Sequence, residues 1–217
     1  VRVAVQPNDG GNRTGSLSFV SSGSSVPYEF TQEGAIIETT ADQINAAEDG
    51  ATLYRITGVV KSIANGTYGN IYIADYTGEV YVYGTYDAEG NRFDAFATPV
   101  KEGDIVTVCG VKTSYKDSPQ MKNVTVEKHI QVAPVSVADF LAAPVAGDVY
   151  YTLTCTMANI VMDKADPTLQ NAYGNFDIVD ESGSVYVYGL LSGWGGPKQM
   201  FRELNLVEGD KITIVGV

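Results

Sequence analysis

Hydrophobic and polar residues alternate over short stretches of this chain, and glycine-containing turns separate the stretches. Residues 71–75 and 79–85 alternate in this way on either side of Tyr76-Thr77-Gly78, and residues 176–180 and 184–190 do so around Glu181-Ser182-Gly183. Alternation with a period of two is typical of half-buried β-strands, and a short glycine turn between two such runs predicts a β-hairpin. The pattern therefore predicts an all-β protein with two similar hairpins.

The similarity of the two hairpins is part of a longer internal repeat. Three blocks agree in the same order, namely 40–58 with 137–155, 68–84 with 173–189, and 100–111 with 206–217. The second pair is identical at 11 of 17 positions and the third pair at 6 of 12. Self-similarity at this level indicates a duplicated structural unit.

Each unit predicts the same succession of elements. A short helical turn precedes a first strand, the hairpin follows, and a looser, partly helical segment leads through a Glu-Gly-Asp turn to a fourth strand. Only the first unit continues, through a loop predicted at 112–120, into a fifth strand at 121–130. The predicted ranges are 41–47 and 138–143 for the helical turns, 53–63 and 150–162 for the first strands, 93–96 and 200–204 for the looser segments, and 104–111 and 210–217 for the fourth strands.

The order of these elements is that of the five-stranded OB-fold barrel. The stretches RITGVV, IYIADYTGEVYVYG and VKEGDIVTVCGVK resemble the OB-fold module of the anticodon-binding and single-strand-binding type, which occurs in tandem in exported Bacteroidetes proteins. The resemblance implies a first OB-fold over residues 36–133 and a second over 134–217, the second without its last strand.

The first 35 residues differ from the repeats. Residues 1–5, 17–21 and 26–31 read as strands. Asn12, Arg13, Gly15 and Leu17, with the closing Thr-Gln-Glu-Gly at 31–34, resemble the end of a BACON domain, an immunoglobulin-like module associated with carbohydrate binding in Bacteroidetes. The resemblance implies that residues 1–35 are the C-terminal strands of such a sandwich.

The composition of the chain limits its possible partners and its cellular location. The net charge of −12 works against sequence-independent attraction to nucleic acid, and no apolar run approaches the length of a membrane span. Cys109 and Cys155 lie in apolar strand patterns, where we expect buried, reduced thiols. We expect a fragment of an extracellular, cell-surface or periplasmic protein whose native ends, including any export signal, have been removed.

Motifs for catalysis or for a cofactor are weak. His129 lies beside Lys128 without a nucleophile motif, so we expect an ordinary edge residue. Acidic pairs such as Asp163 with Asp166 lack the spacing of a calcium loop, and no glycine loop precedes a long helix. The sequence predicts neither an enzyme nor a metal or cofactor site.

Aromatic residues give the strongest functional signal. If the aliphatic positions of the first hairpin fill the barrel, Tyr72, Tyr81 and Tyr83 lie on its outer face, where OB-folds bind oligonucleotides or oligosaccharides. The alternative is that these tyrosines only stabilise the hairpin or pack one barrel against the other. Further candidates are Tyr86, Arg92 and Tyr115 in the first unit, and Tyr186, Tyr188 and Trp194 in the second.

The two units differ in net charge, and this difference bears on whether either could bind nucleic acid. Residues 51–130 hold eight lysines and arginines against nine acidic residues, a net charge of −1, whereas residues 131–217 have a net charge of −6. A near-neutral barrel is a poor phosphate groove. The leading hypothesis is a non-catalytic module that binds a glycan or a protein. The alternatives are a single-stranded nucleic-acid-binding protein and a spacer for a downstream enzyme domain.

Overall fold

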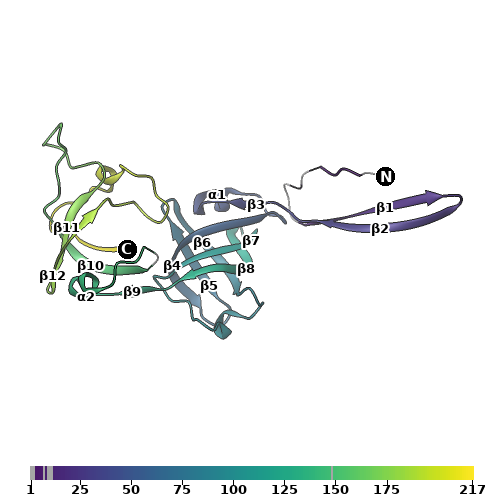
Figure 1. Cartoon of the computed structure of the whole chain (residues 1–217), viewed down its shortest axis with the longest axis horizontal. Coiled ribbons are helices and arrows are strands. Elements are labelled where there is room, and N and C mark those ends of the chain that lie inside the picture. Colours follow the sequence, from purple (N-terminus) through teal and green to yellow (C-terminus); the bar gives the residue numbers. More distant parts are fainter. Residues whose placement is uncertain (1–2, 7, 9–11, 148) are drawn as a thin grey trace.

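The computed structural model describes residues 3–6, 8, 12–147 and 149–217, whose strands form three sheets (Figure 1). A two-stranded hairpin projects from one end of the molecule, a closed barrel lies in the middle, and a second sheet lies at the other end. Strands make up about half of the chain and helices about a tenth, so the prediction of an all-β protein is confirmed.

The barrel closes through five strands in the order β4-β5-β6-β8-β7, with β7 returning to pair with β4. β8 lies parallel to β6 and antiparallel to β7, and the short β3 adds to β4 in parallel. Its strands are β3 (Ile36–Glu38), β4 (Leu53–Asn65), β5 (Asn70–Asp75), β6 (Gly78–Tyr86), β7 (Ile105–Tyr115) and β8 (Ser118–Ile130). The predicted loop at 112–120 is wrong, because β7 and β8 continue through it and join in a two-residue turn at Lys116 and Asp117.

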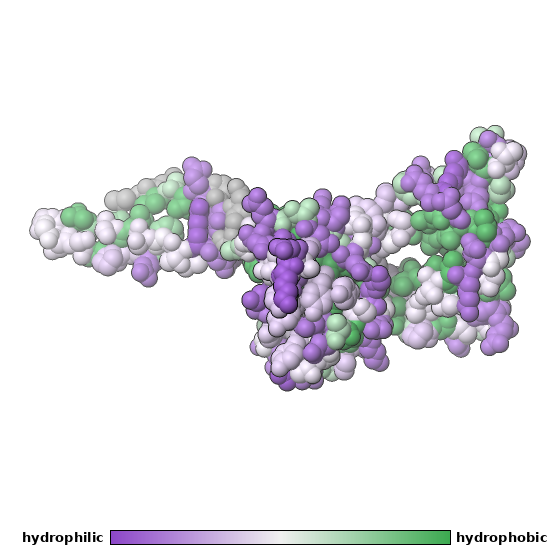
Figure 2. Space-filling view, turned by 180° about the vertical axis from the view of Figure 1, so that it is seen from behind, coloured by the Kyte–Doolittle hydropathy of each residue, from purple (hydrophilic) through white to green (hydrophobic). Residues whose placement is uncertain are grey.

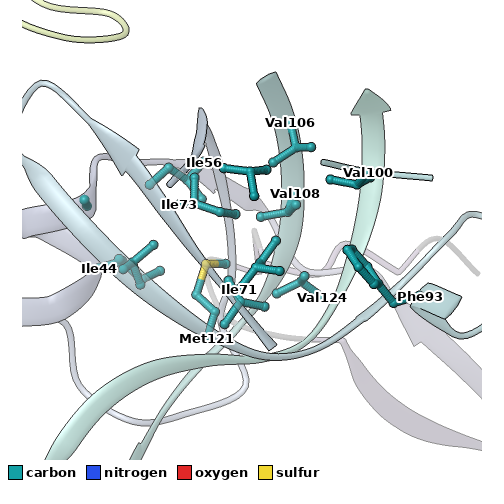
Figure 3. Packing of buried hydrophobic residues seen from close by; sticks show 14 residues of the cluster. Ile44, Ile56, Ile71, Ile73, Phe93, Val100, Val106, Val108, Met121 and Val124 are labelled. Atoms are coloured by element: carbon teal, nitrogen blue, oxygen red, sulfur yellow. The ribbon is translucent and has the colours of Figure 1, made fainter. Parts of the chain in front are cut away.

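The inner face of the hairpin fills the barrel, as the alternation predicts. Ile71, Ile73, Val80 and Val82 are at most 1% exposed and pack with the other buried residues of this core (Figure 3). Helix α1 (Ala41–Ala46) adds Ile44 to the same core.

A hydrogen bond at one end of the barrel and a steric contact at the other fix its two ends. The Ala41 N–H at the start of α1 donates to the Asp75 carboxylate at 2.9 Å, which ties the helix to the β5–β6 turn. At the other end, the 3₁₀ helix η1 (Phe93–Ala95) lays Phe93 over Gly69, whose φ is +68°. A Cβ at Gly69 would lie 2.7 Å from the Phe93 ring, so this position requires glycine for space as well as for its backbone conformation.

The second sheet repeats the pairing of the first repeat up to the fourth strand. β10 pairs with β9, β11 and β13, and β11 pairs with β12, as β4 pairs with β3, β5 and β7, and β5 with β6. Its elements are β9 (Val132–Pro134), α2 (Val137–Ala142), β10 (Tyr150–Ala158), β11 (Asn175–Asp180), β12 (Gly183–Tyr188), the 3₁₀ helix η2 (Phe201–Leu204) and β13 (Lys211–Gly216). No described strand corresponds to β8, so this sheet is open. β10 ends before the predicted residue 162, because Asn159 adopts a left-handed conformation with φ of 49°.

Equivalent side chains make equivalent contacts in the two repeats. The Asp180 carboxylate accepts the Val137 N–H at the start of α2 at 2.9 Å, as Asp75 does for α1. Phe201 lies over Gly174, whose φ is +72°, as Phe93 lies over Gly69. The duplication visible in the sequence is therefore also present in the local structure.

The N-terminal hairpin consists of β1 (Arg13–Ser21) and β2 (Ser24–Gln32), joined at Ser22 and Gly23. These strands include the predicted ranges 17–21 and 26–31. The strand predicted at 1–5 is wrong for residues 3–5, which form no strand, and residues 1 and 2 lie outside the described part.

Candidate functional site

The outer face of the β5–β6 hairpin brings two tyrosines together. Tyr72 and Tyr81 are paired across the two strands, with ring centroids 5.0 Å apart and ring planes tilted by 48°. Both are partly exposed, and burial raises the pKa of Tyr81 above its usual value. The pair presents neutral aromatic surface on the side of the hairpin away from the core.

These tyrosines form one wall of a hollow of about 450 Å³ on the surface of the barrel. The β7–β8 hairpin also lines this hollow, with Tyr115, which is 63% exposed, and Lys116. We call this site the tyrosine hollow, and it is lined by Asn45, Tyr72, Glu79, Tyr81, Tyr115, Lys116, Ser118, Pro119 and Gln120. It thus combines three aromatic rings with amide, hydroxyl and charged groups.

The charges in the tyrosine hollow are balanced. The Glu79 carboxylate forms an ion pair with Lys61, and the Asn45 amide donates to the Glu79 carbonyl oxygen at 2.9 Å. The Lys116 ammonium lies over the Tyr115 ring, 5.3 Å from its centroid. A ligand with many hydroxyl groups and little charge suits such a surface better than a chain of phosphates does.

The β7–β8 turn at the rim has an unusual conformation for its sequence. Lys116 and Asp117 have φ of 47° and 64°, the combination that a two-residue type I′ turn requires. Asn-Gly is the favoured pair in such turns, because residues with a Cβ are strained at positive φ. Strain of this kind concentrates at functional sites, which agrees with the position of the turn in the wall of the hollow.

We expect the double substitution Lys116→Asn with Asp117→Gly to stabilise the barrel. Relief of left-handed strain at these positions is worth about 1 kcal/mol. Urea unfolding would measure the gain, and Lys122→Asn on the neighbouring strand is the control for loss of a lysine charge. An unchanged or lower free energy of unfolding for the double variant would contradict strain in this turn.

The other predicted residues of the first repeat lie outside the tyrosine hollow. Tyr83 is half exposed on the same face of β6 but does not line the hollow. Arg92 forms a bidentate ion pair with Asp94 and places its guanidinium carbon 5.4 Å from the centroid of the Tyr68 ring. The sequence reasoning missed Tyr68 as an exposed aromatic residue beside Arg92, although its counterpart Tyr173 is part of the same repeat block.

Tyr86 belongs to this second cluster, since it forms an isolated β-bridge with Arg92. The structure therefore separates the candidates of the first repeat into the tyrosine hollow and a group around Arg92.

The hairpin of the second repeat lacks the tyrosine pair of the first, and the hollow of about 410 Å³ beside its turn is lined by polar and aliphatic residues, among them Asp180, Glu181 and Lys211. Tyr186 and Tyr188 are 52% and 87% exposed on β12, but Asp177 replaces Tyr72 and accepts a hydrogen bond from the Asn159 amide at 2.8 Å. Ser184 stands where the first repeat has Glu79.

Trp194 instead lies between the two repeats. Its ring is 5.6 Å from that of Tyr150, and its carbonyl oxygen accepts the Tyr76 N–H from the β5–β6 turn at 3.2 Å. The Trp194 ring thus packs on Tyr150 within the second repeat, and its backbone contacts the β5–β6 turn of the first.

Groups with catalytic potential are held in structural contacts. The His129 Nε2 atom lies 2.8 Å from the Asp104 carboxylate, which is 2% exposed, so the expectation of an ordinary edge residue is corrected to a partly buried structural contact. Cys155 is buried as predicted and Cys109 is only partly buried, and both are free thiols whose pKa values are raised by burial.

Neither a metal centre nor a membrane-spanning helix is found among the described residues. No three histidine, cysteine, aspartate or glutamate side chains there are grouped so that they could hold a metal ion. None of the helices in that part of the chain has the length and apolarity needed to cross a membrane.

No protein-family model matches this chain, and no curated protein matches its sequence.

Proposed function

We propose that this chain is a non-catalytic binding module and that the tyrosine hollow of its barrel holds a glycan. The observation that carries the proposal is the convergence of Tyr72, Tyr81 and Tyr115 from two hairpins on one hollow of about 450 Å³. Aromatic rings stack on the apolar faces of sugars, and a shallow hollow open to solvent leaves room for an extended oligosaccharide.

The polar groups around the rings support a sugar as the ligand. Asn45, Ser118 and Gln120 offer hydrogen-bond donors and acceptors of the kind that sugar hydroxyls use. Glu79 and Lys116 contribute opposite charges to the same hollow, so it presents no field of a single sign. We propose a neutral or weakly charged oligosaccharide as the ligand. The same surface could instead bind a protein segment rich in aromatic and polar side chains.

Single-stranded nucleic acid is the second candidate, because a barrel with tyrosines on its outer face is a common platform for stacked bases. The basic side chains of the barrel count against it. Arg55 pairs with Glu38 and Glu127, Lys61 with Glu79, Arg92 with Asp94, and Lys112 with Asp49. Four of the eight basic side chains of residues 51–130 are thus already paired with carboxylates, which weakens the barrel as a phosphate site.

The proposal includes the wider setting of the module. The closed barrel and the repeated strand pairing support two tandem OB-type units over residues 36–133 and 134–217. We also propose that residues 1–35 are a BACON-like, immunoglobulin-type remnant, on the resemblance of their sequence. A module of this composition suits the cell surface or periplasm, where it would bind glycans or act as a spacer beside an enzyme domain.

The test is glycan-array screening followed by calorimetry with the best glycan. We expect Tyr81→Ala to weaken binding by about 1 to 3 kcal/mol, the usual worth of one stacking platform, with little dependence on salt. Tyr186→Ala is the matched control, because Tyr186 has the corresponding position in the second repeat and does not line the hollow.

Four results would count against the proposal. No glycan binding, or an equal effect of both substitutions, would remove the tyrosine hollow as a glycan site. Tight oligonucleotide binding that is lost at high salt would favour the nucleic-acid candidate. Absence of both kinds of binding would leave the spacer function.

A further inference from the structure

Two lysines without a carboxylate partner lie at and beside the tyrosine hollow. Residues 51–130 hold eight basic side chains, of which four form ion pairs with carboxylates. The other four form no ion pair within the part of the chain that the structure describes, and they are Lys101, Lys116, Lys122 and Lys128. Lys116 lines the hollow, and Lys122 lies on β8, which also lines it.

The strand register places Lys122 on the outer face, with the tyrosines. In β8, Gln120 lines the hollow and Met121 is 0% exposed in the core, so the alternation of the strand turns Lys122 outward again. Lys122 is exposed and pairs in register with Tyr83 of β6, which is 50% exposed. Neighbouring strands lie about 4.8 Å apart, so Tyr83 and Lys122 are adjacent and extend the hollow along the sheet.

The carboxylates near the hollow leave the charge of Lys116 unbalanced. Glu79 is the one carboxylate among the lining residues, and it forms an ion pair with Lys61. The Asp117 side chain is exposed in the turn and is not part of the lining. An unpaired ammonium group therefore lies at each end of the β8 segment that lines the hollow, Lys116 at the turn and Lys122 at the far end.

The separation of these two ammonium groups indicates what kind of anion could contact both. Residues 118–122 of β8 span about 13 Å at 3.3 Å per residue, and Lys116 lies beyond them in the turn. A single carboxylate is too small to contact both lysines. Two carboxylates on different rings of one sugar chain can do so, with the rings between them over the tyrosines.

Dense polyanions and apolar partners suit the barrel less well. The chain has a net charge of −12, so every further negative charge on a ligand adds long-range repulsion. Figure 2 shows one face of the molecule, on which hydrophobic residues gather at the second unit while hydrophilic residues and residues of intermediate hydropathy predominate on the barrel. A hydroxyl-rich chain with a few separate carboxylates matches these properties.

Resting on the proposed glycan function, we infer that the ligand is a sugar chain with uronic acids on at least two rings, whose carboxylates bind Lys116 and Lys122. Each ammonium group donates a charge-assisted hydrogen bond to one carboxylate. The rings between the two acids stack on Tyr72 and Tyr81, and their hydroxyl groups bond to polar side chains such as Gln120. The two lysines thus determine specificity within the broader class of neutral or weakly charged oligosaccharides.

The experiment measures calorimetric binding of the 217-residue chain to tetramers of galacturonic, glucuronic and mannuronic acid. Each tetramer is compared with its carboxyl-reduced form, in which every carboxylate has become a primary alcohol and the rings are otherwise unchanged. Partly exposed ion pairs are worth about two- to fivefold in affinity each. We therefore expect at least one acid to bind about four- to twentyfold more tightly than its reduced form.

Three lysine variants locate the contacts. Lys116→Gln and Lys122→Gln should each weaken binding of the acid about two- to fivefold and bring it closer to that of the reduced form. Lys128→Gln is the matched control, because Lys128 is also an exposed lysine of β8 without an ion pair but lies six residues beyond Lys122. It should leave binding of the acid unchanged. Thermal melting checks that all three variants are folded.

The outcomes separate this inference from the glycan proposal. Equal binding of the acids and their reduced forms, or binding of neutral glycans alone, would overturn the inference and leave the glycan proposal standing. An equal effect of Lys128→Gln would also overturn it, because the lysines would then act only through net charge. Absence of all glycan binding would remove both. Tighter binding of oligothymidylate than of any uronic acid tetramer would assign the lysines to phosphates and overturn the inference.

Discussion

Phe201→Ala is expected to unfold the second sheet at room temperature while the barrel stays folded. Phe201 is fully buried, stacks on Phe176 with ring centroids 5.6 Å apart, and covers Gly174. Truncation of a buried phenylalanine to alanine costs about 3 to 5 kcal/mol. The core of the second sheet has seven buried residues against fourteen in the barrel, and no strand among the described residues closes it. A loss of this size therefore exceeds what we expect the second sheet to tolerate.

Phe93→Ala is the matched control, because Phe93 occupies the corresponding place over Gly69 in the barrel. We expect this variant to keep both parts folded with a lower barrel stability. Trp194 is the one tryptophan of the chain and lies in the second repeat, so its fluorescence follows that repeat, whereas far-ultraviolet circular dichroism follows all strands. If both variants instead unfolded in one shared transition, the two repeats would be a single cooperative unit.

The two repeats share a scaffold but differ in the residues that would make a site. Both keep the aspartate that caps the short helix and the phenylalanine over a glycine, which are needed for the fold. Only the first has Tyr72 and the β7–β8 turn with Tyr115, and these build the tyrosine hollow. In the second repeat Asp177 replaces Tyr72 and Ser184 replaces Glu79. The two repeats thus share the contacts that the fold needs and differ on the outer face of the hairpin.

The fold was largely predictable from the sequence. Hydrophobic and polar residues alternate along its strands, and the two repeat units predict the same elements independently. Ile71, Ile73, Val80 and Val82 are buried where the alternation places them. The prediction of a loop at 112–120 was wrong because the hairpin turns at Lys116-Asp117, both at positive φ. This pair is not one of the glycine-containing pairs that usually indicate a two-residue hairpin turn.

The candidate site was less predictable than the fold. Alternation correctly placed Tyr72 and Tyr81 on one outer face, but only the folded β7–β8 hairpin brings Tyr115 to them. The position of Trp194 between the repeats depends on contacts with Tyr76 and Tyr150, which are distant in sequence. Such contacts leave no local pattern, so sequence reasoning could not separate binding aromatics from packing ones.

Asp104→Ala should destabilise the chain far more than the same change at the corresponding Asp210. The Asp104 carboxylate is 2% exposed and accepts the N–H groups of Lys101 at 2.8 Å and Val132 at 3.0 Å. His129 Nε2 lies 2.8 Å from the same carboxylate, so removal leaves three polar groups without their buried partner. Each buried donor that loses its acceptor costs about 1 to 3 kcal/mol.

The matched variant isolates the contacts that are special to the first repeat. Asp210 accepts the Val207 N–H at 2.9 Å, as Asp104 accepts that of Lys101, but no β8 with a histidine follows β13 among the described residues. Loss of this one bond should cost about 1 kcal/mol. Because Val132 begins β9, which pairs with β10, Asp104 also joins the barrel to the first strand of the second sheet. Urea unfolding followed by circular dichroism and by Trp194 fluorescence should therefore show Asp104→Ala lowering the stability of both parts. Equal losses for the two aspartates, or a loss confined to the barrel, would show that this carboxylate does not join the repeats.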